Sequence, residues 1–172
     1  WVEAYRDRRT PERVRMVPVL PDPLPPPEPH AVQREALAAL EQSRAEGNTA
    51  GLVVLATGLG KTWLAAFDAN RPEYRRVLFV AHREEILAQA LSTFRRIRPT
   101  ATLGLYTGGE KAPAAEVLFA SVQTLGRLRH LNQFTPDAFD YLVVDEFHHS
   151  AAATYRRLIE YFQPRFLLGL TA

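Results

Sequence analysis

Two short segments of the sequence carry side chains that could bind and hydrolyse a nucleotide. The first has the sequence A-T-G-L-G-K-T at positions 56–62, directly after the apolar run 52–55. Its two glycines let backbone amides face a phosphate without a Cβ in the way, and the lysine ammonium can reach the β- and γ-phosphates. The final threonine hydroxyl is suited to Mg²⁺. We therefore predict a phosphate-binding loop that opens a helix, with these nucleotide contacts: Thr57, Gly58, Gly60, Lys61 and Thr62.

This loop departs from the strict pattern G-x-x-x-x-G-K-[ST], because Leu55 stands where that pattern has its first glycine. A plain glycine turn between a strand and a helix is the alternative interpretation. The chain holds nineteen arginines but only two lysines, Lys61 and Lys111. Lysine at position 61 is therefore an exception to the general preference of this chain for arginine. A compact ammonium suits a phosphate, which favours the phosphate-binding interpretation.

The second segment is the apolar run 141–144, which ends in Asp145 and Glu146. Ligands of α/β sheets bind at such strand ends. Asp145 would hold Mg²⁺ together with Thr62, and Glu146 would orient or deprotonate an attacking water. Alone, this segment is equally compatible with a solvated strand end that caps a helix. Because both segments end an apolar strand and follow in the right order, we predict a nucleotide-hydrolysing site with these catalytic residues: Lys61, Asp145 and Glu146.

The composition is that of one globular domain, with 172 residues of which 47% are hydrophobic and 23% are charged. No apolar stretch approaches the roughly 20 residues that a membrane helix needs, so we expect no membrane partner. The sequence contains no cysteine, which excludes disulfides and cysteine-ligated metals. This composition suits a reducing compartment, and we expect a cytoplasmic location.

Residues 1–29 differ in composition from the rest of the chain. Seven of the twelve positions 18–29 are proline, which predicts an extended linker. The first fifteen residues hold five arginines against three acids, which accounts for the whole net charge of +2. The remaining body is neutral, so net charge neither demands nor excludes nucleic acid. We expect a terminal segment and linker over 1–29, one domain over 30–172, and a longer protein of which this chain is a piece.

The rest of the chain alternates between apolar runs and helical patterns. The apolar runs predict mostly buried parallel strands at 52–55, 77–81, 102–106, 117–120, 141–144 and 166–170. Helical spacing predicts helices at 30–46, 61–69, 83–98, 122–131 and 152–162. These repeated strand–helix–strand units predict an α/β fold with a doubly wound, mainly parallel sheet. Trp63 and Phe67, four residues apart after the glycine loop, are expected in the core.

The two segments, together with G-L-T-A at 169–172, resemble motifs I, II and III of superfamily-two DEAD/DEAH-like helicases. In that family motif I commonly begins with Ala, Ser or Pro, which accounts for the missing first glycine. The resemblance covers residues 28–172. It implies a RecA-like P-loop domain that uses ATP and Mg²⁺, and a second RecA-like domain in the same longer chain that supplies an arginine finger. It also implies that His148 and Thr171 couple the nucleotide site to a bound strand.

Smaller matches follow in the order that this family shows. Gln33 resembles the upstream glutamine that contacts the adenine edge, whose pattern of donor and acceptor matches a side-chain amide. Residues 80–89 resemble motif Ia, 107–109 the following T-G turn, and 120–125 a strand-end motif that lies along the nucleic-acid backbone. The resemblance thus implies contacts with single-stranded nucleic acid at Arg83, Thr107, Gly108, Ser121, Gln123 and Thr124.

The second motif reads D-E-F-H at 145–148, which places the chain nearer to type III restriction enzymes and DNA translocases than to RNA-remodelling relatives. DNA is therefore the favoured nucleic acid, and the run resembles bacterial helicases with an upstream nuclease domain. One alternative is another P-loop enzyme such as a GTPase or small-molecule kinase, but an N-K-x-D guanine motif is missing. The other is a nucleotide-binding module or ATPase that does not act on nucleic acid. A zinc site at His148 and His149 is disfavoured because no third ligand is suitably spaced.

Overall fold

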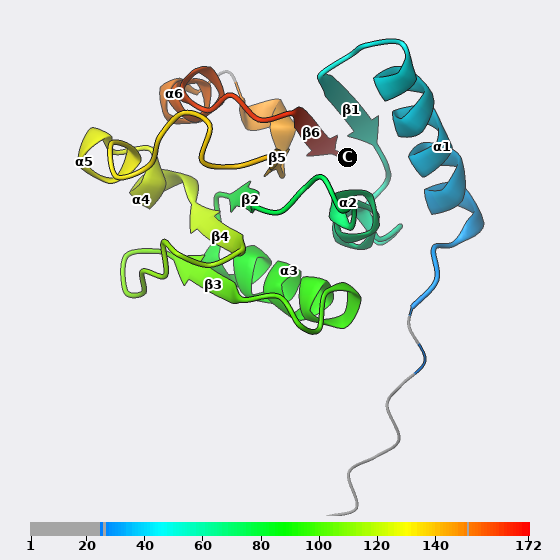
Figure 1. The fold of residues 1–172 in the computed structure, drawn as a ribbon, viewed down its shortest axis with the longest axis horizontal. Helices are drawn as coiled ribbons and strands as arrows, with labels where there is room; N and C mark the ends of the chain where they lie inside the picture. Colours follow the sequence, from blue (N-terminus) through cyan, green and yellow to red (C-terminus); the bar gives the residue numbers. More distant parts are fainter. Residues whose placement is uncertain (1–24, 26, 151) are drawn as a thin grey trace, which may run out of the picture.

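The computed structural model describes residues 25, 27–150 and 152–172, and a six-stranded parallel sheet runs through it (Figure 1). Nearly all of the predicted terminal segment, residues 1–24 and 26, lies outside the described residues. The strands are β1 (Ala50–Val54), β2 (Val77–Ala81), β3 (Leu103–Tyr106), β4 (Val117–Ser121), β5 (Tyr141–Val144) and β6 (Phe166–Thr171). The helices are α1 (Ala31–Ala45), α2 (Lys61–Ala69), α3 (Glu84–Ile97), α4 (Val122–Leu125), α5 (Leu128–Leu131) and α6 (Ala153–Tyr161), with a 3₁₀ turn η1 (Phe147–His149).

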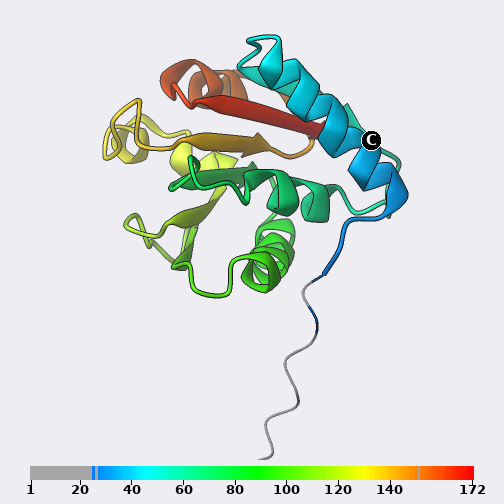
Figure 2. The same ribbon diagram turned by 45° about the vertical axis from the view of Figure 1, so that its right-hand side comes forward.

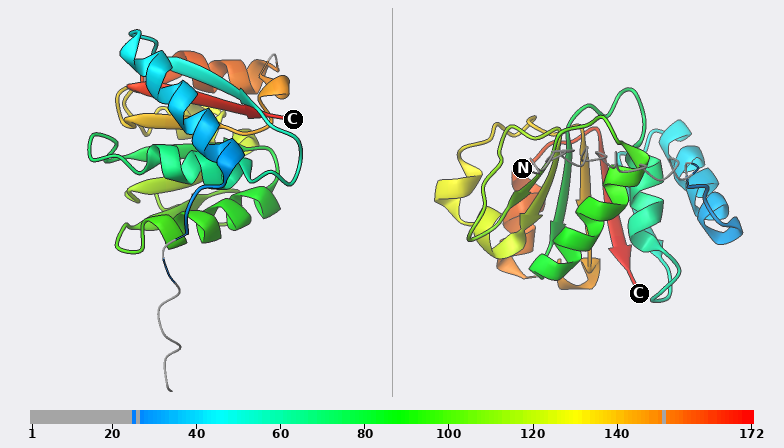
Figure 3. Two further views of the ribbon diagram at one scale, coloured as in Figure 1. Left: turned by 90° about the vertical axis from the view of Figure 1, so that its right-hand side faces the viewer. Right: turned by 90° about the horizontal axis from the view of Figure 1, so that it is seen from below.

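Every strand pair in this sheet is parallel, in the order β1-β6-β5-β2-β4-β3. The predicted parallel α/β fold is therefore confirmed. Because parallel strands point the same way, all loops that follow a strand meet at one edge. In the right-hand view of Figure 3 this edge faces downward, with the loop after β1 beside the end of β6.

Helices cover both faces of the sheet, as the alternation of buried side chains in the strands requires. Residues such as Phe79 and Val143 point into a core packed against α1, α2 and α3. Their neighbours Val80 and Leu142 point into a second core packed against α4 and α6. In Figures 1 and 2 these two groups of helices lie on opposite sides of the sheet.

Two elements differ from the sequence-based expectation. The helix predicted over 122–131 is two short helices, because Arg127 is extended (ψ 132°). Gly126 itself keeps a helical backbone (φ −70°, ψ −5°), and an added Cβ would lie 2.2 Å from the side chain of Thr154, so α6 packs closely against the chain at this point. Strand β1 is not buried on both faces: Leu52 is 55% exposed and Val54 is 64% exposed. β1 lies at the sheet edge, where none of the described helices covers that face.

A buried polar cluster ties three elements together behind the sheet. Arg44 on α1 donates two hydrogen bonds to Asp68 on α2, at 2.9 and 2.5 Å. The hydroxyl of Tyr141 on β5 donates to the same carboxylate at 2.5 Å. The full burial of Asp68 is tolerated because each carboxylate oxygen has a donor. None of the helices in the described ranges has the length and apolar composition needed to cross a bilayer.

Candidate functional site

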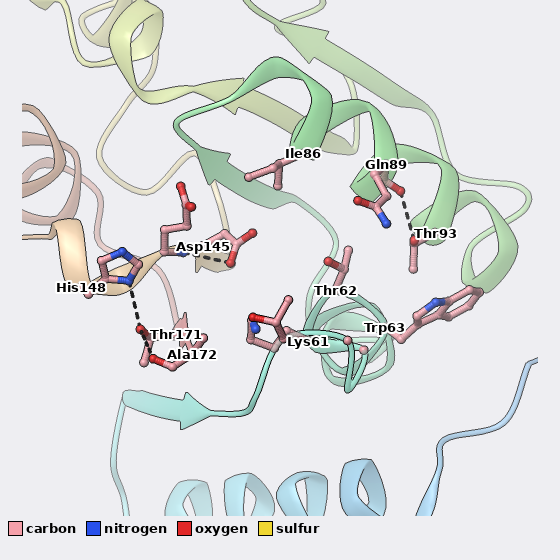
Figure 4. Close-up of a pocket in the computed structure, with 14 residues that line it drawn as sticks. Lys61, Thr62, Trp63, Ile86, Gln89, Thr93, Asp145, His148, Thr171 and Ala172 are labelled. Carbon is pink, nitrogen blue, oxygen red and sulfur yellow. Dashed lines mark hydrogen bonds between the residues drawn. The ribbon is translucent and has the colours of Figure 1, made fainter.

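The residues predicted to bind the phosphates and Mg²⁺ meet in one cavity of about 570 Å³ at the carboxyl edge of the sheet (Figure 4). β6 lies between β1 and β5, so the loop after β1, the acids after β5 and the end of β6 converge there. Figure 4 shows Thr62 and Asp145 approaching from opposite sides. The cavity is lined by Thr57, Gly58, Gly60, Lys61, Thr62, Trp63, Ile86, Gln89, Thr93, Asp145, Glu146, His148, Thr171 and Ala172.

The loop after β1 has the backbone that a phosphate cradle needs. Gly58 and Gly60 adopt positive φ angles of 86° and 76°, which a residue with a Cβ rarely adopts. α2 begins immediately afterwards at Lys61, so its unpaired amides face the cavity. The ammonium of Lys61 donates to the carbonyl oxygen of Leu55 at 3.1 Å. The lysine thus already lies across the loop, held by the backbone of the residue that replaces the usual first glycine.

Gln33 supports this loop from α1. Its amide nitrogen donates to the carbonyl oxygen of Gly60 at 3.1 Å, and its oxygen accepts from the amide of His30 at 2.8 Å. The side chain is 2% exposed and would collide with any Cβ at Gly60, which would lie 2.4 Å from its amide nitrogen. These contacts join the start of α1 to the phosphate loop. A role of Gln33 toward adenine stays a prediction.

The two acids after β5 occupy different environments. Asp145 is 8% exposed, and burial raises the pKa of its carboxyl although the backbone amide of Glu146 donates to it at 2.9 Å. Glu146 is the one residue other than glycine with a positive φ (53°) in the described part of the chain. Such a conformation costs about 1–3 kcal/mol and is typical of functional sites. A buried carboxylate opposite the hydroxyl of Thr62 is a donor set that suits Mg²⁺, which prefers oxygen ligands.

His148 and Thr171 connect the second and third predicted motifs. The imidazole Nδ1 of His148 lies 3.1 Å from the hydroxyl of Thr171. Both residues line the cavity, and their role in coupling to a bound strand stays a prediction. The ring of His149 is tilted by 49° from that of His148, and His149 borders a separate hollow with His82 and Gln123. The described residues contain no group of three metal-ligating side chains.

Five residues that line the cavity were not among the predicted site residues: Trp63, Ile86, Gln89, Thr93 and Ala172. Trp63 was expected in the core, but it is only half-buried and lies 5.3 Å beneath the guanidinium of Arg96. Phe67 likewise is half-buried. Ile86, Gln89 and Thr93 lie on one face of α3, and the hydroxyl of Thr93 donates to the carbonyl oxygen of Gln89 at 3.1 Å. Their spacing of three and four residues is visible in the sequence, but two are polar and do not stand out as a face.

The six residues predicted to contact nucleic acid follow β2, β3 and β4 at the same sheet edge. Arg83, Gly108 and Gln123 are exposed, and the amide of Gln123 lies 2.9 Å from His82 Nδ1. Thr107 is buried, and its hydroxyl accepts from the amide of Gly109 at 3.3 Å. In the remaining pair, Ser121 caps α4: its hydroxyl accepts from the backbone amide of Thr124 at 3.2 Å and donates to the Thr124 hydroxyl at 2.9 Å. Both members of this pair are buried, so their hydroxyls shape the loop.

Comparison with known proteins identifies this arrangement. Residues 27–172 match the family described as type III restriction enzyme, res subunit. The chain belongs to this family. The res-subunit family domain is 35% identical over 136 residues to a protein of Schizosaccharomyces pombe named putative mitochondrial ATP-dependent helicase irc3, covering 76% of this chain and 22% of the relative. It is 36% identical over 136 residues to a Halobacterium salinarum protein named putative DNA 3'-5' helicase Rad25, covering 75% of this chain and 21% of the relative.

The fold of this res-subunit family domain also has solved counterparts. The Sulfolobus solfataricus SWI2/SNF2 ATPase core, solved in complex with dsDNA, superposes with a TM-score of 0.65 at 15% identity. The match covers 85% of this chain and 32% of that one. The predicted RecA-like fold is therefore confirmed. The chain spans about a fifth of the length of the curated relatives it matches.

Proposed function

We propose that this domain is the first motor domain of an ATP-dependent helicase or translocase that acts on DNA. The carrying observation is the convergence of Lys61, Thr62 and the two acids Asp145 and Glu146 on one cavity. The named functions of the relatives, an ATP-dependent helicase and a DNA helicase, support the same conclusion. The cysteine-free composition suits a cytoplasmic location, which we include in the proposal.

The site residues have distinct parts in ATP hydrolysis. The amides of the loop around Gly58 and Gly60 and the ammonium of Lys61 would hold the β- and γ-phosphates. Thr62 and Asp145 would hold Mg²⁺, which when bound neutralises developing charge on the phosphates. Glu146 would accept a proton from the attacking water. The buried position of Asp145 keeps its carboxylate poorly solvated, so a cation would compensate it strongly.

The adenine base has a neighbouring place to bind. A hollow of about 270 Å³ lies beside the phosphate loop and is lined by Pro27, Glu28, His30, Gln33, Trp63, Phe67 and Arg96. Trp63 borders both this hollow and the main cavity. We place adenine here, near the side-chain amide of Gln33 and beside the aromatic rings. The bonds from Gln33 to Gly60 and His30 would then link base binding to the shape of the loop.

Hydrolysis at a useful rate is proposed to need a second RecA-like domain of the full-length protein. An arginine finger typically contributes about 10³–10⁵ in rate. We expect the 172-residue chain to bind Mg²⁺-ATP weakly and to turn over negligibly. The full-length protein should hydrolyse ATP faster with single-stranded DNA, whose backbone would contact the loops after β2, β3 and β4.

The proposal is tested by measuring phosphate release from ATP by the full-length protein with and without single-stranded DNA. Glu146→Gln should abolish release while leaving ATP binding intact, whereas the matched change Glu160→Gln, at an exposed position on α6, should have no effect. Equal hydrolysis with and without DNA, together with no DNA binding, would favour an ATPase that does not act on nucleic acid. Full activity of Glu146→Gln would show that Glu146 is not the general base.

A further inference from the structure

The turn after β3 separates two flanks of opposite charge. Tyr106, the last residue of β3, points into the core beneath α4 and α6, while Leu105 packs on the α3 side. Lys111 pairs with Tyr106 as an antiparallel bridge across the turn, so its side chain lies on the same side, with its ammonium 5.8 Å from the ring centroid. Glu110, one residue earlier, lies on the α3 side.

The α3 flank of this turn is acidic. Glu110 borders a hollow together with Glu84 and Glu85 from the first turn of α3. Three exposed carboxylates therefore border this flank, against the single cation of Arg83 at the start of α3. A phosphate backbone would be repelled by the carboxylates there, since like charges within about 8 Å are incompletely screened at physiological salt.

The opposite flank is basic and is held by two separate sets of hydrogen bonds. Lys111 donates to the carbonyl oxygen of Thr107 at 3.1 Å, which fixes it against the turn. The hydroxyl of Tyr106 lies 3.0 Å from Nδ1 of His130 and donates to Gln133 at 3.1 Å. Nε of Arg129 donates to Nε2 of His130 at 3.3 Å. α5 and the connection between β3 and β4 accordingly lie at the same end of the molecule (Figures 1 and 2).

These bonds determine the state of the buried imidazole. Nε2 of His130 accepts a hydrogen bond, so its proton lies on Nδ1, which donates to the hydroxyl of Tyr106. Burial, helped by the cations Arg129, Lys111 and Arg127, lowers the pKa of His130 and keeps it neutral. The neutral ring anchors Arg129 through Nε alone, and the terminal nitrogens of this exposed guanidinium are not used by that bond.

We propose that a single nucleic-acid strand in contact with Thr107–Gly109 continues over α5, with its phosphates on Lys111 and Arg129, and not over the acidic flank of α3. This inference rests on the proposed function, because it names the path of the strand on the same domain. Arg129 is presented as an oriented fork, and such a fork suits a phosphate oxygen pair. The contacts carry no base information, so the path is independent of sequence.

The test measures binding of fluorescein-labelled oligo(dT) to the full-length protein by anisotropy over a series of salt concentrations. Arg129→Gln and Lys111→Gln should each weaken binding about five-fold and reduce the salt slope by about one. The matched control is Arg75→Gln, an exposed arginine before β2 at the opposite sheet edge, which should change neither quantity. The double variant Glu84→Gln, Glu85→Gln should leave affinity within about two-fold.

The outcomes separate this inference from the proposed function. If the unaltered full-length protein fails to bind oligo(dT), the proposed function itself fails. If it binds, but Arg129→Gln and Lys111→Gln behave like Arg75→Gln, only the path over α5 is overturned. Tighter binding by the double glutamate variant, larger than the loss from Arg129→Gln, would place the strand on the α3 flank. If Arg129→Gln and Lys111→Gln lose the stimulation of ATP hydrolysis by DNA but still bind oligo(dT) normally, α5 would contact another part of the protein and not DNA. That result would also overturn the inference.

Discussion

The imidazole Nδ1 of His148 lies 3.1 Å from the hydroxyl of Thr171, although the two residues are 23 positions apart in the sequence. His148 follows β5, and Thr171 ends β6, the strand that lies between β5 and β1. The hydrogen bond therefore joins two residues that line the cavity. It connects the segment that bears Glu146 to the strand that also borders the phosphate loop.

This link predicts that Thr171→Val impairs coupling more than ATP binding. Valine keeps the shape of threonine but cannot bond to His148. We expect the DNA-stimulated kcat of the full-length protein to fall about ten-fold, while the affinity for a fluorescent ADP analogue changes less than two-fold. Thr171→Ser keeps the hydroxyl and should retain most of the stimulation. Equal loss in both variants would show that packing, and not the hydrogen bond, is responsible.

Asp145→Asn should stabilise the nucleotide-free chain while removing Mg²⁺-dependent binding. Burial raises the pKa of Asp145 above its unfolded value, so the charged carboxylate costs stability at neutral pH, and that cost disappears as the pH falls below the folded pKa. Asparagine removes the charge and keeps the shape. Urea unfolding near pH 7 should show a gain of about 1 kcal/mol. Binding of the ADP analogue to Asp145→Asn should become insensitive to EDTA. If binding stays sensitive, Asp145 does not bind the metal.

Two buried tyrosines should respond oppositely to loss of the hydroxyl. Tyr155 has a buried hydroxyl without a hydrogen-bond partner among the described residues, and burial beside Glu146 and Asp145 raises its pKa to about 12. Tyr141 instead donates to Asp68. Tyr155→Phe should leave the free energy of unfolding unchanged or raise it by up to about 1 kcal/mol, whereas Tyr141→Phe should lower it by about 1–2 kcal/mol. A clear loss for Tyr155→Phe would reveal a partner that forms in solution.

The stability of the chain should fall in mild acid partly through His130. Its pKa is lowered in the folded state, because it is buried among Tyr106, Arg129, Lys111 and Arg127. The unfolded chain then binds more protons, so this contribution is complete above about pH 6.5 and is lost as the pH falls toward the folded pKa. Urea unfolding at about pH 7.5 and 5.5 should show a smaller drop for His130→Gln than for the unaltered chain. Identical drops would assign the loss to other groups.

Much of the site was predictable from local sequence. The phosphate loop could be identified because Gly58, Gly60 and Lys61 lie within four residues, and the conformation of the two glycines depends on local backbone sterics. The strands were predictable because runs such as 77–81 and 141–144 are buried on both faces and so are apolar throughout. The acids after β5 were predictable because a carboxylate pair directly after such a run is an abrupt change of polarity.

What the sequence determined by itself was therefore the type of each element and the chemistry at its end. Only the tertiary structure decided which ends meet, because strand order is set by packing across the whole sheet: β6 enters between β1 and β5 and brings Thr171 beside His148. The structure also showed that the predicted helix is interrupted at Arg127, beside the close contact of Gly126 with α6, and that Leu52 and Val54 are exposed. The sequence also did not reveal that the acidic and basic side chains around the turn after β3 lie on opposite flanks, because tertiary packing sets these positions too. Glu110 and Lys111 are neighbours in sequence, and the pleat of the paired backbone sends them to opposite faces.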